Sequence, residues 1–345
     1  MASTVFETDN ALTKKAWDEK LFRESELDTF FSDYKSTKKD SIVWVKDELS
    51  KGQGDQVTFG LRTLLEGAGQ TGDSFLEGKE EKIKTYDDSV TLEQYRHAVR
   101  RKGRLSKKRA MFSIDDEMKE ALMEWMRAKK DQLCVDAILD APTRVAYQVS
   151  GTFTVATSAA TAATAMHASN TLITPKLISQ IRTYARTGGM VNGKRRFMPV
   201  KPIMIGGKSY NGLIVPEDVL NDLFNNAEMQ TANREARERD IDNPLFQSAD
   251  LIYNGVLIRG YEKMPTLSTG GAGGNVNYGK CVFLGAQSLI WANGEREETV
   301  TETFDFGNEV GVATGMICKV KKPKFNSEDY GSIGVYVACS NISGS

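Results

Sequence analysis

The sequence predicts an α+β protein, in which one long helix and a few shorter ones precede a series of strands. Three patterns support this class. A capped helical pattern covers 112–140, shorter helical patterns follow Thr174 and Pro216, and strand-like segments dominate after residue 251. With 345 residues, the chain is long enough for two domains or one large elaborated domain, because a common domain has about 150 residues.

Composition places the chain among ordinary globular proteins. Hydrophobic residues make up 40% and charged residues 26% of it, which excludes global disorder. The 45 Lys and Arg residues nearly balance the 46 Asp and Glu residues, and this argues against a protein that coats nucleic acid along its whole surface. The start lacks the features of a signal peptide, and no apolar stretch approaches the ~18 residues that span a bilayer. We therefore expect a protein that is made and kept in a cytoplasm.

Residues 1–50 are expected to form a charged arm. Apolar residues recur irregularly at helical spacing over 12–34, with Lys, Asp and Glu between them. An isolated amphipathic helix of this kind is marginal in water. We therefore expect the arm to pack on another surface.

Residues 51–110 are expected to form a long hairpin with little core of its own. Apolar and polar residues alternate over 56–65 as in a strand, and a second strand candidate covers 89–97. A turn spaced by glycines lies between them. Because so few apolar residues are present, we expect the hairpin to lie on a neighbouring surface.

Two stretches of opposite charge lie within this hairpin. The stretch 77–88 is acidic and the stretch 100–109 is basic. A basic patch can bind phosphate groups, but this one lacks the interleaved aromatic residues of single-strand binders. Pairing of the two stretches, within the hairpin or across a subunit boundary, is the favoured interpretation. The candidate contact residues are Glu77, Glu80, Glu81, Arg100, Arg101 and Arg104.

The pattern over 112–140 predicts a helix about 40 Å long, at 1.5 Å per residue. Ser113 and Asp116 have the S-x-x-D spacing of a capping box. Pro142 lies just beyond the expected end, where a helix cannot continue. A rod of this length suits a structural spine.

One face of this helix is expected to enter a domain core. Met118, Leu122 and Trp125 follow one another at helical spacing. For Trp125 the alternative is a contact between subunits, where aromatic anchors are common. We favour the core, because Trp125 lies mid-helix on the same stripe as Met118.

The second half of the chain offers further helices and strands. Thr174 and Pro175 occupy the N-cap and first-turn positions of a helix, and a short strand at 213–215 leads through Pro216 into another helix. Ala, Thr and Ser crowd residues 150–170, a composition that specifies little structure. Late strand candidates cover 251–258, 281–291, 299–306, 310–320 and 333–339.

Two glycine motifs resemble nucleotide-binding loops without their context. Gly67, Gly69 and Gly72 match the dinucleotide fingerprint, but the residues that follow are too rich in glycine and acid to open a helix. Residues 274–281 nearly spell a phosphate loop, with Cys281 in place of the hydroxyl that would hold Mg²⁺. A strand candidate follows where a helix is needed. We interpret the first motif as a hairpin turn and the second as a mobile surface loop.

No catalytic, cofactor or metal site emerges from the remaining residues. The four cysteines and two histidines are scattered, without the spacing of metal ligands. His97 has no nucleophile motif to accompany it. We expect neither enzyme activity nor a bound cofactor or metal.

An ordered series of short segments resembles the major capsid proteins of tailed bacteriophages, specifically the N-four-like major capsid family. The resemblance is dense over 12–139 and looser afterwards. The segments that carry it are Leu12 with Trp17, Phe30-Phe31, GDQVTF at 54–59, LEGKEE at 76–81, QYRHAVR at 94–100, Leu122 with Trp125, NPLF at 243–246 and Gly255-Val256.

The resemblance implies the Hong Kong 97-like capsid fold. That fold has an N-terminal arm, an extended E-loop, a peripheral P-domain with a long spine helix, and an axial A-domain. The implied divisions are the arm at 1–50, the E-loop hairpin at 51–110, the P-domain spine helix at 111–149, mainly A-domain at 150–290, and P-domain strands with the C-terminus at 291–345.

The resemblance also implies assembly rather than catalysis. Copies of the chain would form the hexamers and pentamers of an icosahedral shell that encloses double-stranded DNA without sequence-specific binding. The implied partners are further copies of the chain, a portal, and cement, decoration or scaffold proteins, but no membrane. The implied location is the virion capsid, after assembly in the host bacterial cytoplasm. Two alternatives stay open: an encapsulin-like nanocompartment shell of the same fold and, less favoured, a phosphate-loop nucleotide-binding enzyme.

Overall fold

The protein forms two compact units. A computed structural model describes residues 29–47, 54–65, 67, 69–73, 75–110, 113–191, 195–205, 207–231 and 251–340. Within these residues, the spine unit comprises Tyr95–Lys129 and Glu297–Met316, and the sheet unit comprises 29–94, 130–296 and 317–340. Most of the predicted arm and the NPLF segment lie outside the described residues. None of the helices in the described part is long and apolar enough to cross a membrane.

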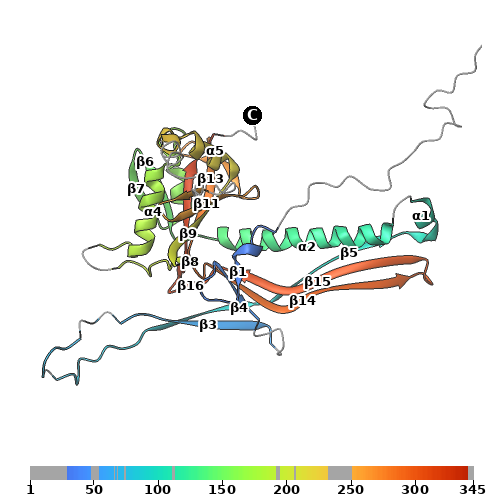
Figure 1. Ribbon diagram of the computed structural model, residues 1–345, viewed down its shortest axis with the longest axis horizontal. Helices are drawn as coiled ribbons and strands as arrows, with labels where there is room; N and C mark the ends of the chain where they lie inside the picture. The colour runs from blue at the N-terminus through green and yellow to red at the C-terminus, as the bar shows by residue number, and fades with distance from the viewer. Residues whose placement is uncertain are drawn as a thin grey trace, which may run out of the picture. The chain divides into compact units, whose positions relative to one another are not determined.

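A nine-stranded sheet forms the body of the sheet unit (Figure 1). Its strands are β6 (Val145–Val149), β7 (Thr152–Ala156), β8 (Ile203–Ile205), β9 (Lys208–Val215), β10 (Leu251–Tyr253), β11 (Val256–Gly260), β12 (Thr266–Gly270), β13 (Val276–Leu284) and β18 (Ser332–Ala338). They follow the order β10-β11-β9-β13-β18-β6-β7, with β12 paired to β13 and β8 to β9. Every residue of the central strand β18 is buried, as expected for a strand covered on both faces.

Helices α3 (Ala159–Thr164), α4 (Pro175–Thr187) and α5 (Glu217–Asn225) belong to the same unit. Helix α4 starts at the predicted residue, because the Thr174 hydroxyl oxygen accepts a hydrogen bond from the backbone N–H of Leu177 at 3.2 Å. It ends at Gly188, whose φ of 68° is the left-handed conformation that favours glycine. The predicted strand before Pro216 and the helix after it are also confirmed.

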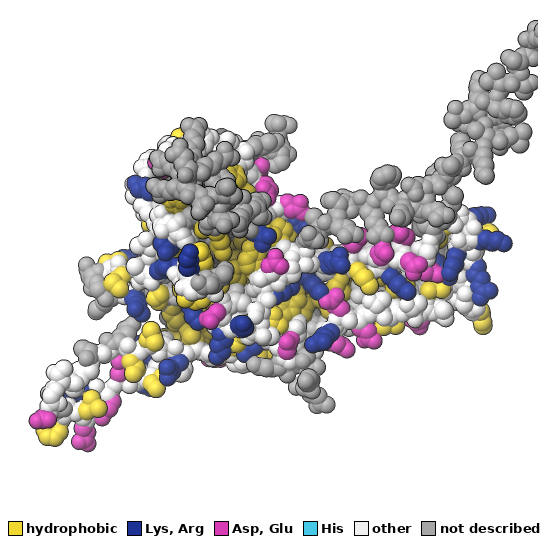
Figure 2. All heavy atoms as spheres, in the orientation of Figure 1, with side chains coloured by type: hydrophobic (Ala, Val, Ile, Leu, Met, Phe, Trp, Pro, Cys, Tyr) yellow, Lys and Arg dark blue, Asp and Glu magenta, His cyan; other side chains and the backbone are white. Residues whose placement is uncertain are grey.

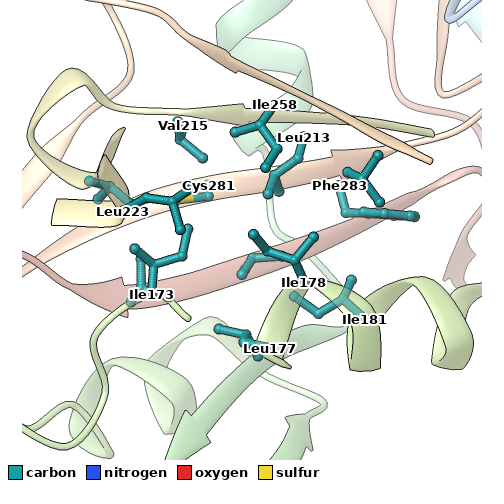
Figure 3. Close-up of a cluster of buried hydrophobic side chains, with 14 of the residues drawn as sticks. Ile173, Leu177, Ile178, Ile181, Leu213, Val215, Leu223, Ile258, Cys281 and Phe283 are labelled. Atoms are coloured by element: carbon teal, nitrogen blue, oxygen red, sulfur yellow. The ribbon is translucent and has the colours of Figure 1, made fainter. Parts of the chain in front are cut away.

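The main hydrophobic core lies between this sheet and its helices (Figure 3). Leu177, Ile178 and Ile181 of α4 point toward side chains of the sheet, among them Leu213 and Phe283. All five side chains are almost completely buried. Burial of one such side chain contributes about 1.5–3 kcal/mol to folding. Because many such side chains are buried within this one chain, the region can be stable without a partner.

A two-stranded hairpin extends from the same unit (Figure 1). Its strands β3 (Gln56–Arg62) and β4 (Thr85–Thr91) are antiparallel, with Gln56 opposite Thr91 and Arg62 opposite Thr85. The predicted hairpin is therefore present, but its paired strands end at Thr91. The residues that follow form β5 (Glu93–Arg101), which belongs to a different sheet.

A second sheet has five strands in the order β1-β2-β14-β15-β5. Besides β5, its members are β1 (Lys35–Ser36), β2 (Val43–Lys46), β14 (Leu289–Phe304) and β15 (Glu309–Lys321). A 3₁₀ turn η1 (Ser32–Tyr34) precedes β1, and a small hairpin of β16 (Lys324–Phe325) and β17 (Glu328–Asp329) follows β15. Among the described residues, strand β14 pairs with β2 from Leu289 to Ala292.

Two helices complete the fold. Helix α1 (Gly103–Arg109) covers most of the basic stretch, and helix α2 (Ile114–Leu139) is the predicted long helix. The backbone N–H groups of Asp116 and Glu117 donate to the Ser113 carbonyl, so the helix starts where the capping pattern indicated. Its 26 residues confirm the predicted spine.

Like the strand predicted at 89–97, which is divided between β4 and β5, two of the late strand predictions were wrong in detail. The segment 251–258 is a hairpin rather than one strand, because Asn254 and Gly255 both have positive φ and form a tight turn. The segment 281–291 is divided between β13 and β14, which lie in different sheets. In contrast, the strands expected at 310–320 and 333–339 are confirmed.

Candidate assembly surfaces

The base of the β3–β4 hairpin is firmly attached to the sheet unit. Val57, Phe59 and Val90 are buried in one cluster with Ile290 and Phe325. The rings of Phe59 and Phe325 meet edge to face, with centroids 6.0 Å apart. These contacts fix the direction in which the hairpin leaves the body.

An ion pair adds to this attachment. The Asp88 carboxylate on β4 accepts a hydrogen bond from the Lys321 ammonium at 2.6 Å and another from the backbone N–H of Lys324 at 3.0 Å. The Asp88 side chain is largely buried. The hairpin is thus held by polar as well as apolar contacts at its base.

The tip of the hairpin has the opposite character. Its large apolar side chains are exposed: Leu64, Leu65, Phe75, Leu76 and Ile83. Figure 2 shows hydrophobic and charged side chains mixed at this end of the hairpin. Soluble monomers rarely gather large apolar side chains on a protruding element, and such patches mark contact surfaces.

The acidic candidates also lie on this tip. Glu77, Glu80 and Glu81 are exposed, and Glu81 accepts a hydrogen bond from the backbone N–H of Gly67 at 2.7 Å. Gly69 and Gly72 have positive φ within the turn. The described residues of the glycine motif thus belong to a hairpin turn, as expected, and no helix that could bind a pyrophosphate follows among the described residues up to β4.

The basic candidates lie in the spine unit. The Arg100 guanidinium pairs with Glu309 at 2.5 Å, and that of Arg101 pairs with Asp115 at 2.6 Å. The backbone N–H of Arg104 donates to the side chain of Asn308. Arg100 and Arg101 therefore find partners on β15 and α2 rather than on the acidic stretch, and pairing across a subunit boundary stays a prediction.

Asp115 is the centre of this cluster. Its second carboxylate oxygen accepts a hydrogen bond from the Lys107 ammonium at 2.7 Å. The hydrogen bonds from Lys107 and then Arg101 lower the pKa of the Asp115 carboxyl. Through Asp115, the first turn of α2 is thus joined to α1 by Lys107 and to the end of β5 by Arg101.

The core candidates on α2 differ in burial. Met118 and Leu122 are buried in a cluster with Val312, and Met126 is buried as well. Trp125 is only partly buried, and its ring packs against that of His97 with centroids 4.8 Å apart. Since an α-helix advances about 100° per residue, Trp125 lies about 60° from the centre of the face made by the other three.

The phosphate-loop match has no structural support. Residues from Val276 onward form strand β13, so the expected mobile loop was wrong for this part of the motif. Cys281 is completely buried within that strand, and its burial raises the pKa of the thiol. Among the described residues, no group of three or more His, Cys, Asp or Glu side chains is placed to bind a metal.

Comparison with known proteins identifies the family. The family model for phage capsid protein matches residues 6–341, nearly the whole chain. The chain belongs to the phage capsid protein family. A major capsid protein from Pseudomonas phage KPP25 is 25% identical over 359 residues, covering 94% of this chain and 95% of the relative.

Solved structures agree on the fold. The capsid of Ralstonia phage GP4 matches with a TM-score of 0.78 at 22% identity, covering 100% of both chains. The capsid asymmetric unit of cyanophage Pam1 has a TM-score of 0.78 at 21% identity and covers 99% of this chain and 100% of its own. These solved structures show that the protein has the Hong Kong 97-like fold. Together with the family model over residues 6–341, the matches make the chain a tailed-phage major capsid protein, many copies of which form the capsid of the virion.

Sequence reasoning named the charged residues of the hairpin tip but missed its apolar ones. The large apolar residues of the turn were a signal in the sequence, because a turn between two strands is ordinarily polar in a monomer. These residues are Leu64, Leu65, Phe75 and Leu76. Apolar side chains at such a place indicate a partner.

Proposed function

We propose that this capsid protein assembles into the hexamers and pentamers of an icosahedral shell around double-stranded DNA, and that the tip of the β3–β4 hairpin drives the assembly. The observation that carries the proposal is the contrast within the hairpin. Its base is buried against the body, whereas Phe75 at the tip is 86% exposed. A fixed arm that presents apolar side chains suits docking on a second copy.

The energies are large enough for this role. Burying one Leu or Phe side chain is worth about 1.5–3 kcal/mol, and the tip offers several. Part of this gain offsets the entropy lost on association, which costs at least about 4 kcal/mol. The acidic residues Glu77, Glu80 and Glu81 would add a network of exposed ion pairs with basic side chains of the second copy, each worth about 0–1 kcal/mol.

The net charge of the chain suits the wall of a shell that encloses DNA. Its formal net charge of −1 allows the shell to enclose DNA without binding it tightly along the wall. We infer that the shell forms in the host cytoplasm, that a portal occupies part of it, and that cement, decoration or scaffold proteins complete it. An encapsulin-like compartment would instead hold a cargo enzyme.

Electron microscopy of the purified protein tests the proposal. Wild type should form closed shells with fivefold and sixfold capsomers, and particles made in the host should protect DNA from nuclease. Failure to assemble at any concentration or salt would contradict self-assembly, and particles filled with protein cargo instead of DNA would favour the compartment.

Variants of the tip test its role. Phe75→Ser with Leu76→Ser should leave soluble, folded subunits that do not form shells. Met204→Ser is the matched control, because Met204 is also exposed but lies on β8, which is not part of the hairpin. If the tip variant assembles as well as the control, the tip does not drive assembly.

A further inference from the structure

Strand β14 has a long open edge in the spine unit. On the side away from β15, its pairing with β2 ends at Ala292. Among the described residues no strand covers that side of 298–303, and all six residues are exposed. An open strand edge offers backbone N–H and C=O groups to any other strand.

The residues of this edge have a regular pattern. Glu298, Val300 and Glu302 alternate with three threonines, and threonine and valine both favour strands. The ring of Phe304, at the end of the same alternation, lies against the Arg100 guanidinium at 4.1 Å. Glu298, Val300 and Glu302 therefore share the face on which Arg100 lies.

The opposite edge of the same sheet carries the complementary pattern. Strand β5 pairs only with β15 in the described residues, and it contains Arg96, Ala98 and Arg100 in alternation. The residues between them face α2, because His97 stacks on Trp125 and Val99 joins the cluster of Met118.

Arg96, Ala98 and Arg100 consequently lie on the face away from α2, and all three are exposed. One edge of the sheet thus presents acid–apolar–acid and the other presents base–apolar–base, on the same face of the sheet. Residues directly opposite each other in paired strands always share a face, so the two patterns can meet without turning either sheet over.

We propose that the acidic edge of β14 in one copy pairs with the basic edge of β5 in the next copy, so that the sheets of neighbouring spine units become continuous. The occupant of each edge is a second copy of this chain. Glu298 and Glu302 then face arginines, and Val300 faces Ala98. The inference rests on the proposed self-assembly.

The charges also exclude the wrong pairings. Two β14 edges would place glutamates opposite glutamates, and two β5 edges would place arginines opposite arginines, which destabilises a strand pair. Only the head-to-tail combination pairs opposite charges. A head-to-tail contact repeats from copy to copy and can close into a ring.

Cysteine cross-linking tests the contact directly. Within one copy, β15 separates positions 98 and 300, so two strand spacings keep them at least about 10 Å apart. A disulfide needs Cα atoms within about 7 Å, so a link between these positions has to join two copies. The four native cysteines are buried and do not interfere.

The variant Ala98→Cys with Val300→Cys is assembled, oxidised with diamide and separated on a non-reducing denaturing gel. We expect a ladder of dimers, trimers and larger species. Ala98→Cys alone and Val300→Cys alone are the matched controls and should stay monomeric on the gel. Particles of the double variant that give only monomers, or single variants that cross-link equally well, would overturn the proposal while leaving self-assembly intact.

A charge exchange decides the matter if the cysteine variant does not assemble. Glu298→Arg with Glu302→Arg should lower the assembled fraction by about threefold or more, with an unchanged circular dichroism spectrum. Adding Arg96→Glu should restore part of the loss. A combined variant no better than the reversed edge alone would contradict the pairing.

Discussion

The nine-stranded sheet and the β3–β4 hairpin, which belong to one unit, differ in where their apolar side chains go. In the sheet, Phe283 is 1% exposed and belongs to the same buried cluster as the apolar residues of α4. At the hairpin tip, Phe75 is 86% exposed. Both side chains have the same transfer free energy from water. The sheet completes its core within one chain, and we propose that another copy covers the apolar side chains of the hairpin tip.

The most direct test of this difference is to truncate both side chains. Phe283→Ala should lower the free energy of unfolding of the unassembled subunit by about 3–5 kcal/mol, through lost burial and the cavity left behind. Phe75→Ala should change it by no more than about 0.5 kcal/mol. Urea denaturation measures both values. A large loss for Phe75→Ala would mean that the tip is already packed in the subunit.

The spine unit allows the same comparison within one helix. Leu122→Ala should cost about 2–5 kcal/mol, because Leu122 is 1% exposed in the cluster with Val312. Met123→Ala, at the next residue on the exposed side, is the matched control and should cost at most about 0.5 kcal/mol.

Trp125→Ala should fall between these two values. The ring of Trp125 is partly buried against His97 rather than enclosed. Urea denaturation of the unassembled subunit again gives the value. A loss larger than that of Leu122→Ala would place Trp125 at the centre of the core after all.

A smaller expected effect concerns the N-cap of α4, which should stabilise the unassembled subunit because it lies within one chain. Thr174→Ala removes the cap of α4 and should cost about 1 kcal/mol in the unassembled subunit. Thr183→Ala, on the exposed side of the same helix, is the control and should cost less. Equal losses in the two variants would show that the cap contributes nothing.

The smallest expected effect concerns pH in the spine unit. The pKa of Asp115 is lowered in the folded chain, chiefly by Lys107. Its contribution to stability is therefore present above the ordinary pKa of about 4 and is lost as the pH falls through the folded value. The difference in stability between wild type and Asp115→Asn should shrink from pH 7 to pH 3. Lys107→Met should reproduce most of the loss at pH 7, and a difference independent of pH would contradict the ion pair.

Local signals in the sequence were enough for the helices. Thr174 and Pro175 carry the start of α4 in their own side chains, and α2 begins just after Ser113, where the local capping pattern placed its start. These predictions succeeded because the deciding interactions lie within a few residues.

Predictions that depend on distant partners were less complete. Strand β5 was assigned to the hairpin, because its partner β15 lies far along the chain and nothing near Glu93 reveals it. Trp125 looked central on the helix, whereas the position of β5 leaves it at the margin of the core. The apolar residues of the hairpin tip were visible in the sequence, but only the structure shows that the chain leaves them uncovered.

Amide hydrogen exchange, compared between unassembled subunits and shells, tests the central claim most directly. We predict that the hairpin tip, over 63–84, exchanges fast in subunits and slowly in shells, while β13 is protected equally in both. A tip that exchanges as fast in shells as in subunits would contradict the claim that another copy completes its core.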